Sequence, residues 1–112
     1  MTEVREIMSP CSLTLCPETT LAEAALRLAE HQVDGAPVVA GDGTLVGIIS
    51  ERQLLDLVFD SSARNAPVSK YMTENVHVVE PQDSLLHVAQ LLALYSFRRI
   101  PVVEHEKFVG VV

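Results

Sequence analysis

The 112-residue sequence lacks the features that mark a membrane-spanning or a secreted chain. No uninterrupted apolar stretch reaches the roughly 18 residues that a membrane-spanning helix needs. Met1 is followed by Thr2-Glu3-Val4-Arg5-Glu6, which has neither the basic nor the apolar part of a secretory signal. We therefore expect a cytoplasmic protein, or the cytosolic part of a larger one, without direct membrane contact.

Basic residues are scarce, because 8 Lys and Arg stand against 15 Asp and Glu and give a net charge of −7. Nucleic acids and anionic lipid surfaces attract basic proteins, so this balance argues against nucleic acid as a partner. A site for a small phosphate-bearing ligand would have to be built locally.

Residues of metal sites and of catalytic machinery are also few. Cys11 and Cys16 are too few for a disulfide framework and lack the histidine cluster of a zinc site. We expect two reduced thiols, with a redox pair as the alternative. Four histidines show no close ligand spacing: His31, His77, His87 and His105. With neither a Walker-type phosphate loop nor a dinucleotide glycine fingerprint, we predict no catalytic residue, no metal site and no required cofactor, and hence no enzyme.

The sequence does contain an internal repeat. Asp34-Gly35-Ala36-Pro37-Val38-Val39 returns 64 residues later as Arg98-Arg99-Ile100-Pro101-Val102-Val103. The same offset relates three further pairs: Met8 and Met72, Pro17 and Pro81, Leu21 and Leu85. Repeats that keep their spacing indicate duplicated supersecondary units. We assign residues 1–60 to the first repeat with its N-terminal segment, 61–67 to a linker and 68–112 to the second repeat.

Each repeat is expected to contain a helix that begins at a hydroxyl cap. Thr20-Leu21-Ala22-Glu23 has the spacing of a capping box, in which hydroxyl and carboxylate bond to free backbone N–H groups. Ser84 is the corresponding cap in the second repeat. Apolar residues recur after both caps at helical spacing: Leu21, Ala24, Ala25 and Leu28, then Leu85, Val88, Ala89 and Leu92. One side of each helix is therefore apolar.

A hairpin is predicted after each helix. Val38-Val39 and a later β-branched run indicate two strands, and Gly41-Asp42-Gly43-Thr44 between them is rich in turn formers. His105-Glu106-Lys107 occupies this place in the second repeat and is a weaker turn signal because it lacks glycine. Ser50-Glu51-Arg52-Gln53 then caps a second helix in the first repeat. The chain ends at Val112, before the equivalent helix, so we expect the second repeat to be incomplete.

In this order, and repeated over a period of about 60 residues, these segments resemble a tandem pair of CBS domains, also called a Bateman module. The resemblance implies a fold of the α/β (α+β) class. Two β-α-β-β-α repeats would pack through their sheets about a pseudo-two-fold axis, with the second repeat lacking its final helix. It also implies a regulatory protein whose clefts bind AMP, ADP, ATP or S-adenosylmethionine. Such a module would form a homodimer and control an attached or partner enzyme, transporter or channel.

The resemblance also implies ligand-binding residues in the first repeat. Nucleotide-binding members carry Ser/Thr-x-x-Asp, with a hydroxyl near phosphate and a carboxylate on the ribose. Here Ser50 is kept and Gln53 replaces the acid, which gives a weaker, uncharged partner for a diol. A capping box formed by Ser50 and Gln53 is an equally good interpretation. Thr14, Ala36 and Pro37 correspond to the wall that meets the base, with ordinary strand packing as the alternative for Ala36 and Pro37. Because Gln53 replaces the acid, a structural or dimerisation module that has lost ligand binding is the alternative function.

In the second repeat, Arg98 and Arg99 precede Ile100 and Pro101, where related modules carry phosphate-binding side chains. Guanidinium donors suit phosphate oxygens. Since neighbouring residues on a strand point to opposite faces, at most one arginine should enter a cleft; two surface arginines are the alternative. Asp34 matches Arg98 in the first repeat and would repel phosphate. We therefore expect two unequal clefts, with an anionic ligand favouring the one that an arginine reaches.

Overall fold

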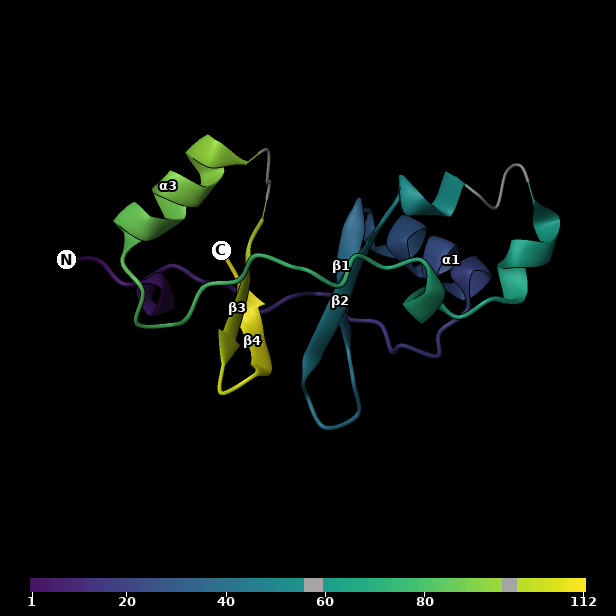
Figure 1. Ribbon diagram of the computed structural model, residues 1–112, viewed down its shortest axis with the longest axis horizontal. Helices are drawn as coiled ribbons and strands as arrows, with labels where there is room; N and C mark the ends of the chain where they lie inside the picture. Colours follow the sequence, from purple (N-terminus) through teal and green to yellow (C-terminus); the bar gives the residue numbers. More distant parts are fainter. Residues whose placement is uncertain (56–59, 96–98) are drawn as a thin grey trace. The chain divides into compact units, whose positions relative to one another are not determined.

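The computed structural model describes the whole chain except residues 56–59 and 96–98. The longer elements, labelled in Figure 1, are α1 (Leu21–His31), β1 (Gly35–Val39), β2 (Leu45–Ser50), α3 (Leu85–Leu94), β3 (Pro101–Glu104) and β4 (Lys107–Val111). Short 3-10 helices are η1 (Val4–Glu6), η2 (Gln53–Leu55), η3 (Ser61–Asn65) and η4 (Val68–Lys70). The predicted α+β class is confirmed. Within the described ranges no helix is long and apolar enough to cross a membrane.

The chain divides into two compact units. The central unit comprises Ser12–Val76, and the terminal unit comprises Met1–Cys11 together with His77–Val112. Each unit has its own buried apolar cluster, built around Leu15, Val38 and Ile49 in the central unit. The equivalent cluster of the terminal unit contains Val79, Val102 and other apolar residues. Burial of such side chains is the main source of stability in each unit.

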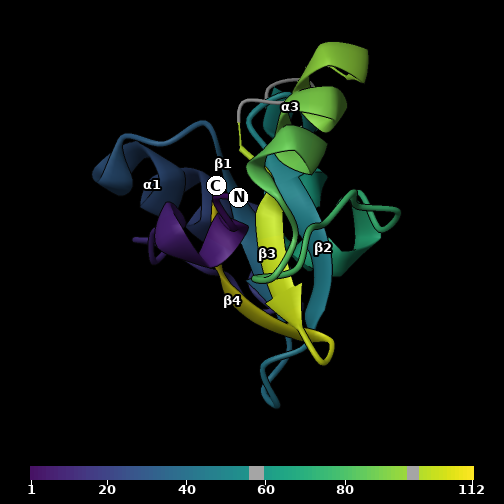
Figure 2. The same cartoon turned by 90° about the vertical axis from the view of Figure 1, so that its left-hand side faces the viewer.

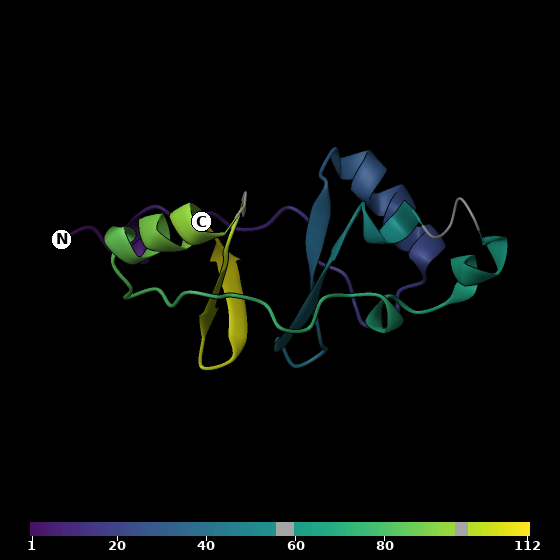
Figure 3. The ribbon, with the colours of Figure 1, turned by 45° about the horizontal axis from the view of Figure 1, so that its top comes forward.

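The central unit is organised around the β1–β2 hairpin, which Figure 3 shows beside α1. The two strands pair antiparallel, with Gly35 opposite Ser50, and this confirms the predicted hairpin. Leu15 pairs in parallel with the free side of β1. On the free side of β2, Thr73 pairs with Ile48 through N–H to carbonyl bonds of 2.8 and 2.9 Å. An extended segment therefore covers each edge of the hairpin.

The terminal unit repeats this arrangement around β3 and β4 (Figure 2). Val79 pairs in parallel with β3, and its N–H donates to the Pro101 carbonyl at 3.1 Å. Ser9 pairs antiparallel with Val111 through two bonds of 2.9 Å. Both hairpins thus have equivalent neighbours, a parallel segment beside the first strand and an antiparallel segment beside the second.

The turns of the two hairpins differ. In the β1–β2 turn, Gly43 has a φ of 93°, and the Thr44 N–H donates to the Asp42 carboxylate at 3.0 Å. In the β3–β4 turn, His105 and Glu106 have φ values of 51° and 70°. This left-handed region costs side-chain-bearing residues energy, so the second hairpin closes through a strained pair.

The segments that open the two repeats are exchanged between the units. Val4 opens the first repeat but is buried in the terminal unit, where its N–H donates to the Asp83 carbonyl at 2.8 Å. Val68 opens the second repeat but is buried in the central unit and donates to the Thr19 carbonyl, also at 2.8 Å. The repeats along the sequence and the units in space therefore have different boundaries.

Helix α1 begins at the predicted hydroxyl cap and buries three of the four residues of its predicted apolar stripe. The Thr20 hydroxyl accepts the Glu23 N–H at 3.2 Å, which satisfies a free donor at the helix start. Three residues of the apolar stripe are buried: Leu21, Ala24 and Leu28. Ala63 of η3 is buried in the same cluster, so the predicted linker contributes to the core. The second predicted helix appears as η2, and the rest of that prediction falls on residues 56–59, outside the described residues.

Helix α3 has the predicted cap but a different environment. The Ser84 hydroxyl accepts the His87 N–H at 3.2 Å. Of the second apolar stripe only Val88 is buried, whereas Leu85 and Leu92 are 41% and 44% exposed. The stripe of α1 has partners in the structure, because α1 packs against η3, and Leu54 packs on the same apolar cluster.

Candidate functional site

The structure distributes the predicted ligand-binding residues over both units. Five belong to the central unit: Thr14, Ala36, Pro37, Ser50 and Gln53. Three belong to the terminal unit: Arg99, Ile100 and Pro101. Arg98 lies outside the described residues. Within the central unit, the five residues gather around β1 and β2, because Leu15 next to Thr14 pairs with β1 and Ser50 ends β2.

The predicted base-side wall is formed largely by buried strand. Thr14 is exposed, whereas Ala36 is 3% exposed and belongs to the apolar cluster of the central unit. Pro37 is also buried, and its carbonyl accepts the Leu15 N–H at 2.9 Å. The Ala36 side chain therefore packs in the core, in agreement with the strand-packing interpretation. Contact of these residues with a base stays a prediction.

Ser50 and Gln53 are joined by hydrogen bonds within the protein. The Gln53 Oε1 accepts the Ser50 N–H at 2.7 Å and the Ser50 hydroxyl at 3.3 Å. The first of these bonds is the one that a capping box requires of its fourth residue. The Gln53 Nε2 donates to the Tyr71 carbonyl at 2.8 Å and to the Thr73 hydroxyl at 3.0 Å. The bonds to Tyr71 and Thr73 were not predicted from the sequence. The only related signal is that Thr73 aligns with Ser9 at the offset of 64, so that both repeats carry a hydroxyl at this position.

The two residues before β3 alternate between an exposed and a buried side chain, as expected in an extended segment. Arg99 is exposed, whereas Ile100 is 1% exposed and lies in the apolar cluster of the terminal unit. The backbone of Ile100 exchanges bonds of 2.9 and 3.0 Å with Val112, which fixes this stretch beside β4. Pro101 is buried. The exposed guanidinium of Arg99 thus lies next to a residue whose backbone is hydrogen-bonded to Val112.

The electrostatics of the two matching stretches differ. Asp34, half-buried, precedes β1, and its carbonyl accepts the Glu51 N–H at 2.9 Å. Arg99 precedes β3 with the opposite charge. Outside these stretches, hydrogen bonds from the Ser62 hydroxyl and N–H lower the pKa of Asp60, the residue that caps η3. In the part of the chain that the structure describes, no group of His, Cys, Asp or Glu is placed to hold a metal ion.

A model of the CBS domain family matches residues 4–60 and, a second time, residues 68–112. The chain belongs to the CBS domain family. The two matches confirm the tandem pair that the repeated segments predict.

Solved CBS pairs have the same fold as this one. CBSX2 in complex with AMP is 33% identical with a TM-score of 0.87, over 98% of this chain and 88% of CBSX2. The CBS pair of protein MJ0100, in complex with 5-methylthioadenosine and S-adenosyl-L-methionine, is 28% identical with a TM-score of 0.82. That likeness covers 99% of this chain and 88% of the other.

Relatives of this CBS pair differ widely in length. It is 32% identical to the CBS domain-containing protein YhcV of Bacillus subtilis, over 100% of this chain and 80% of YhcV. Protein MJ1225 of Methanocaldococcus jannaschii is 33% identical, and 97% of this chain spans 39% of that protein. The A-adding tRNA nucleotidyltransferase of Aquifex aeolicus is 31% identical, and 98% of this chain spans 13% of that enzyme. CBS pairs therefore occur both in short proteins and as parts of larger enzymes.

Proposed function

We propose that this CBS pair is a regulatory, non-catalytic module that binds an adenine nucleotide or a related adenosyl ligand. The likeness to CBSX2 in complex with AMP, at 33% identity over nearly the whole chain, is the observation that carries the proposal. The MJ0100 pair with 5-methylthioadenosine and S-adenosyl-L-methionine supports the wider adenosyl class. The module would act in the cytoplasm on an attached domain or on a partner protein, and as a homodimer.

The phosphate of such a ligand would be bound from the terminal unit. Arg99 is exposed, and the buried Ile100 beside it fixes its backbone. The matching stretch of the central unit carries Asp34, whose carboxylate would repel phosphate. Arg98 remains a second candidate. Within the central unit, Thr14 and the strand at Ala36 and Pro37 are the candidates for contact with an adenine base.

Regulation by this ligand requires more than binding. A ligand shifts the population of two arrangements only if it binds them with different affinities. The partner or attached domain must then distinguish the same two arrangements. The proposal therefore predicts that the partner changes the affinity for the ligand by the same factor by which the ligand changes the affinity for the partner.

A ligand screen tests the proposal directly. Thermal unfolding is measured with AMP, ADP, ATP, S-adenosylmethionine and 5-methylthioadenosine at millimolar concentration, with GMP as the control for the base. A ligand that binds the folded form raises the unfolding temperature in proportion to the logarithm of its concentration above the Kd. We expect at least one adenosyl compound to do so and GMP not to. Absence of any shift, confirmed by calorimetry, would contradict the proposal.

A structural or dimerisation module that has lost ligand binding is the second candidate. The exposed apolar side chains of α3, among them Leu86 at 60% and Leu94 at 75%, favour it. Sedimentation velocity separates the two candidates when it is combined with the ligand screen. A stable dimer that responds to no adenosyl compound would support the structural role.

A further inference from the structure

The side-chain amide of Gln53 connects the end of β2 to a segment that follows much later in the chain. Its oxygen accepts from the Ser50 N–H at 2.7 Å and from the Ser50 hydroxyl at 3.3 Å. Its nitrogen donates to the Tyr71 carbonyl and the Thr73 hydroxyl, which are 18 and 20 residues away. All of these groups belong to the central unit.

These four bonds occupy the whole hydrogen-bonding capacity of the amide. A side-chain amide has two N–H donors and one oxygen with two acceptor positions. A ribose diol donates two hydroxyls and is best bound by a carboxylate, which has two acceptor oxygens. The single oxygen of Gln53 is already bonded to a backbone N–H at 2.7 Å. Binding a diol here would therefore break bonds that hold the protein together.

The segment that Gln53 contacts is seated closely on β2. Thr73 pairs with Ile48 through two backbone bonds of 2.8 and 2.9 Å. Gly47 allows this approach, because a Cβ there would lie 2.6 Å from the Met72 sulfur and 2.9 Å from the Thr73 carbonyl oxygen. A carboxylate at position 53 would face the Tyr71 carbonyl oxygen, which now accepts an N–H, and would be repelled by it. The donors and acceptors around position 53 therefore favour an amide over a carboxylate.

We infer that Gln53 is a positioning residue that clamps the Tyr71–Thr73 segment onto β2, and that it does not recognise a ribose diol. The segment belongs to the second repeat in sequence, whereas Gln53 belongs to the first. The amide therefore joins the two repeats inside the central unit. The statement about ribose rests on the proposed function; the statement about the clamp does not.

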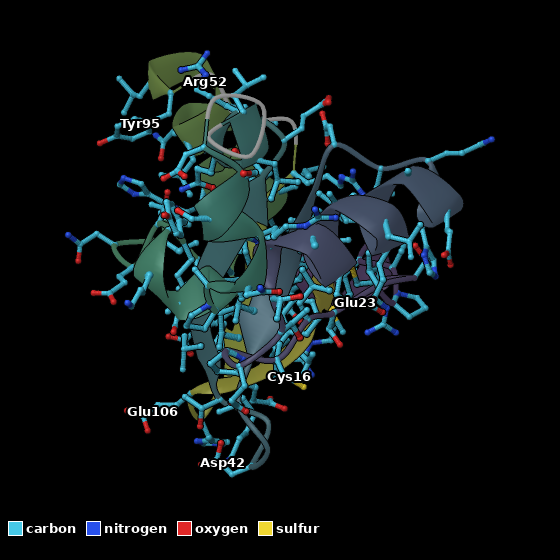
Figure 4. The ribbon with its side chains drawn as sticks, turned by 90° about the vertical axis from the view of Figure 1, so that its right-hand side faces the viewer. Cys16, Glu23, Asp42, Arg52, Tyr95 and Glu106 are labelled. Atoms are coloured by element: carbon cyan, nitrogen blue, oxygen red, sulfur yellow. The ribbon has the colours of Figure 1, made fainter. Side chains whose placement is uncertain are left out.

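Amide hydrogen exchange tests the clamp without any ligand. In Gln53→Leu, which keeps the size but removes all four bonds, exchange at the Ile48 and Thr73 amides should become about tenfold faster. The Leu15 and Val39 amides, bonded across the opposite edge of the sheet at 2.9 and 2.8 Å, should stay within about twofold of wild type. Arg52→Leu is the matched control, because Arg52 is a close neighbour and points outward (Figure 4). Unchanged exchange at Ile48 and Thr73, or an equal increase at all four amides, would overturn the inference.

Two further variants separate the clamp from a general loss of packing. Thr73→Val removes one accepting hydroxyl, keeps the side-chain shape and should accelerate the same two amides to a smaller extent. Gln53→Glu should show a pH dependence that a packing role lacks. Its carboxylate repels the Tyr71 carbonyl at neutral pH, whereas the protonated carboxyl can donate to it. The excess exchange over wild type at the same pH should shrink as pH falls through the carboxyl pKa, and a pH-independent excess would count against the clamp.

The ribose statement is tested by calorimetry with AMP and 2′,3′-dideoxy-AMP. The ratio of the two affinities should be the same, within about twofold, in wild type and in Gln53→Leu. A preference for AMP that falls about tenfold or more in Gln53→Leu would show that Gln53 binds the diol. If wild type binds neither compound, the proposed function fails, and the exchange measurements alone decide the clamp.

Discussion

Arg99 is the residue that we propose to contact the ligand phosphate in this CBS pair. In Arg99→Ala we expect the affinity for AMP to fall about tenfold, because charge-assisted hydrogen bonds to phosphate are lost at an exposed position. The affinity for adenosine, which lacks the phosphate, should change by less than about twofold. Isothermal calorimetry with both compounds measures the difference.

Two variants control for charge and for the neighbouring arginine. Arg64→Ala removes the same charge from an exposed position in η3 and should leave both affinities unchanged. Arg98→Ala is measured in parallel, since alternation along an extended segment predicts that at most one of the two arginines reaches the ligand. An equal loss of AMP and adenosine affinity in Arg99→Ala would indicate damage to the fold instead of a phosphate contact.

At the residue scale, local patterns were predictable and distant partners were not. The hydroxyl caps Thr20 and Ser84 accept the bonds that their spacing predicts. The alternation of Arg99 and Ile100 also follows from strand geometry alone. The bonds from Gln53 to the Tyr71–Thr73 segment span about 20 residues, and nothing local distinguishes an amide that will find them. Roles in ligand binding stay predictions, because they depend on a molecule that the sequence does not contain.

At the scale of elements, the β3–β4 turn is a place where the chain is less stable than it could be. His105 and Glu106 both adopt positive φ, where Asn and Gly are favoured in a two-residue hairpin turn. The double variant His105→Asn, Glu106→Gly should raise the free energy of unfolding by about 1 kcal/mol. Urea unfolding followed by circular dichroism measures the change.

The β1–β2 turn provides the opposite control. Gly43 has a φ of 93°, so Gly43→Ala should lower the free energy of unfolding by about 1 kcal/mol. Both experiments test whether positive φ favours Gly or Asn in these turns. The free energy of unfolding should rise in the His105→Asn, Glu106→Gly variant and fall in Gly43→Ala. A destabilised His105→Asn, Glu106→Gly variant would mean that contacts of the original side chains outweigh the backbone strain.

The two long helices show what an apolar stripe predicts and what it leaves open. Both sequences carry apolar residues at helical spacing, and both form a helix. In α1 the stripe is buried, because Ala63 and Leu54 share its cluster. In α3 only Val88 is buried among the predicted stripe. Spacing predicts which side of a helix is apolar, whereas burial depends on elements elsewhere that supply a partner surface.

At the scale of the whole molecule, the exchange of the opening segments could not be predicted from the duplication in the sequence. Alignment of the repeats predicts that Val4 and Val68 occupy equivalent places, and both are fully buried. It does not predict which sheet each joins, since the two sheets offer nearly the same edge. The structure pairs the Ser9 segment with β4 and the Thr73 segment with β2. Each unit is therefore completed by residues from the other repeat.

The exchange predicts a crossed pattern of mutational effects. Val4→Ala should perturb the terminal unit, with amide chemical shifts changing most at Val79 and Val103, although Val4 belongs to the first repeat. Val68→Ala should perturb the central unit at Leu15 and Val39. Each variant should lower the free energy of unfolding by about 2 kcal/mol, because a buried side chain is truncated.

Heteronuclear correlation spectra of the two variants decide between exchanged and unexchanged segments, because shift changes are local even where unfolding is cooperative. If the segments packed on their own repeats, Val4→Ala would instead shift the Leu15 and Val39 amides. A reversed pattern of this kind would place the opening segment of each repeat on its own hairpin and contradict the exchange. The same result would remove the basis of the Gln53 clamp, since the Tyr71–Thr73 segment would no longer lie on β2. The Val68→Ala result therefore bears on both the exchange of segments and the Gln53 clamp, because the clamp needs the Tyr71–Thr73 segment on β2, whereas the Val4→Ala result bears on the exchange alone.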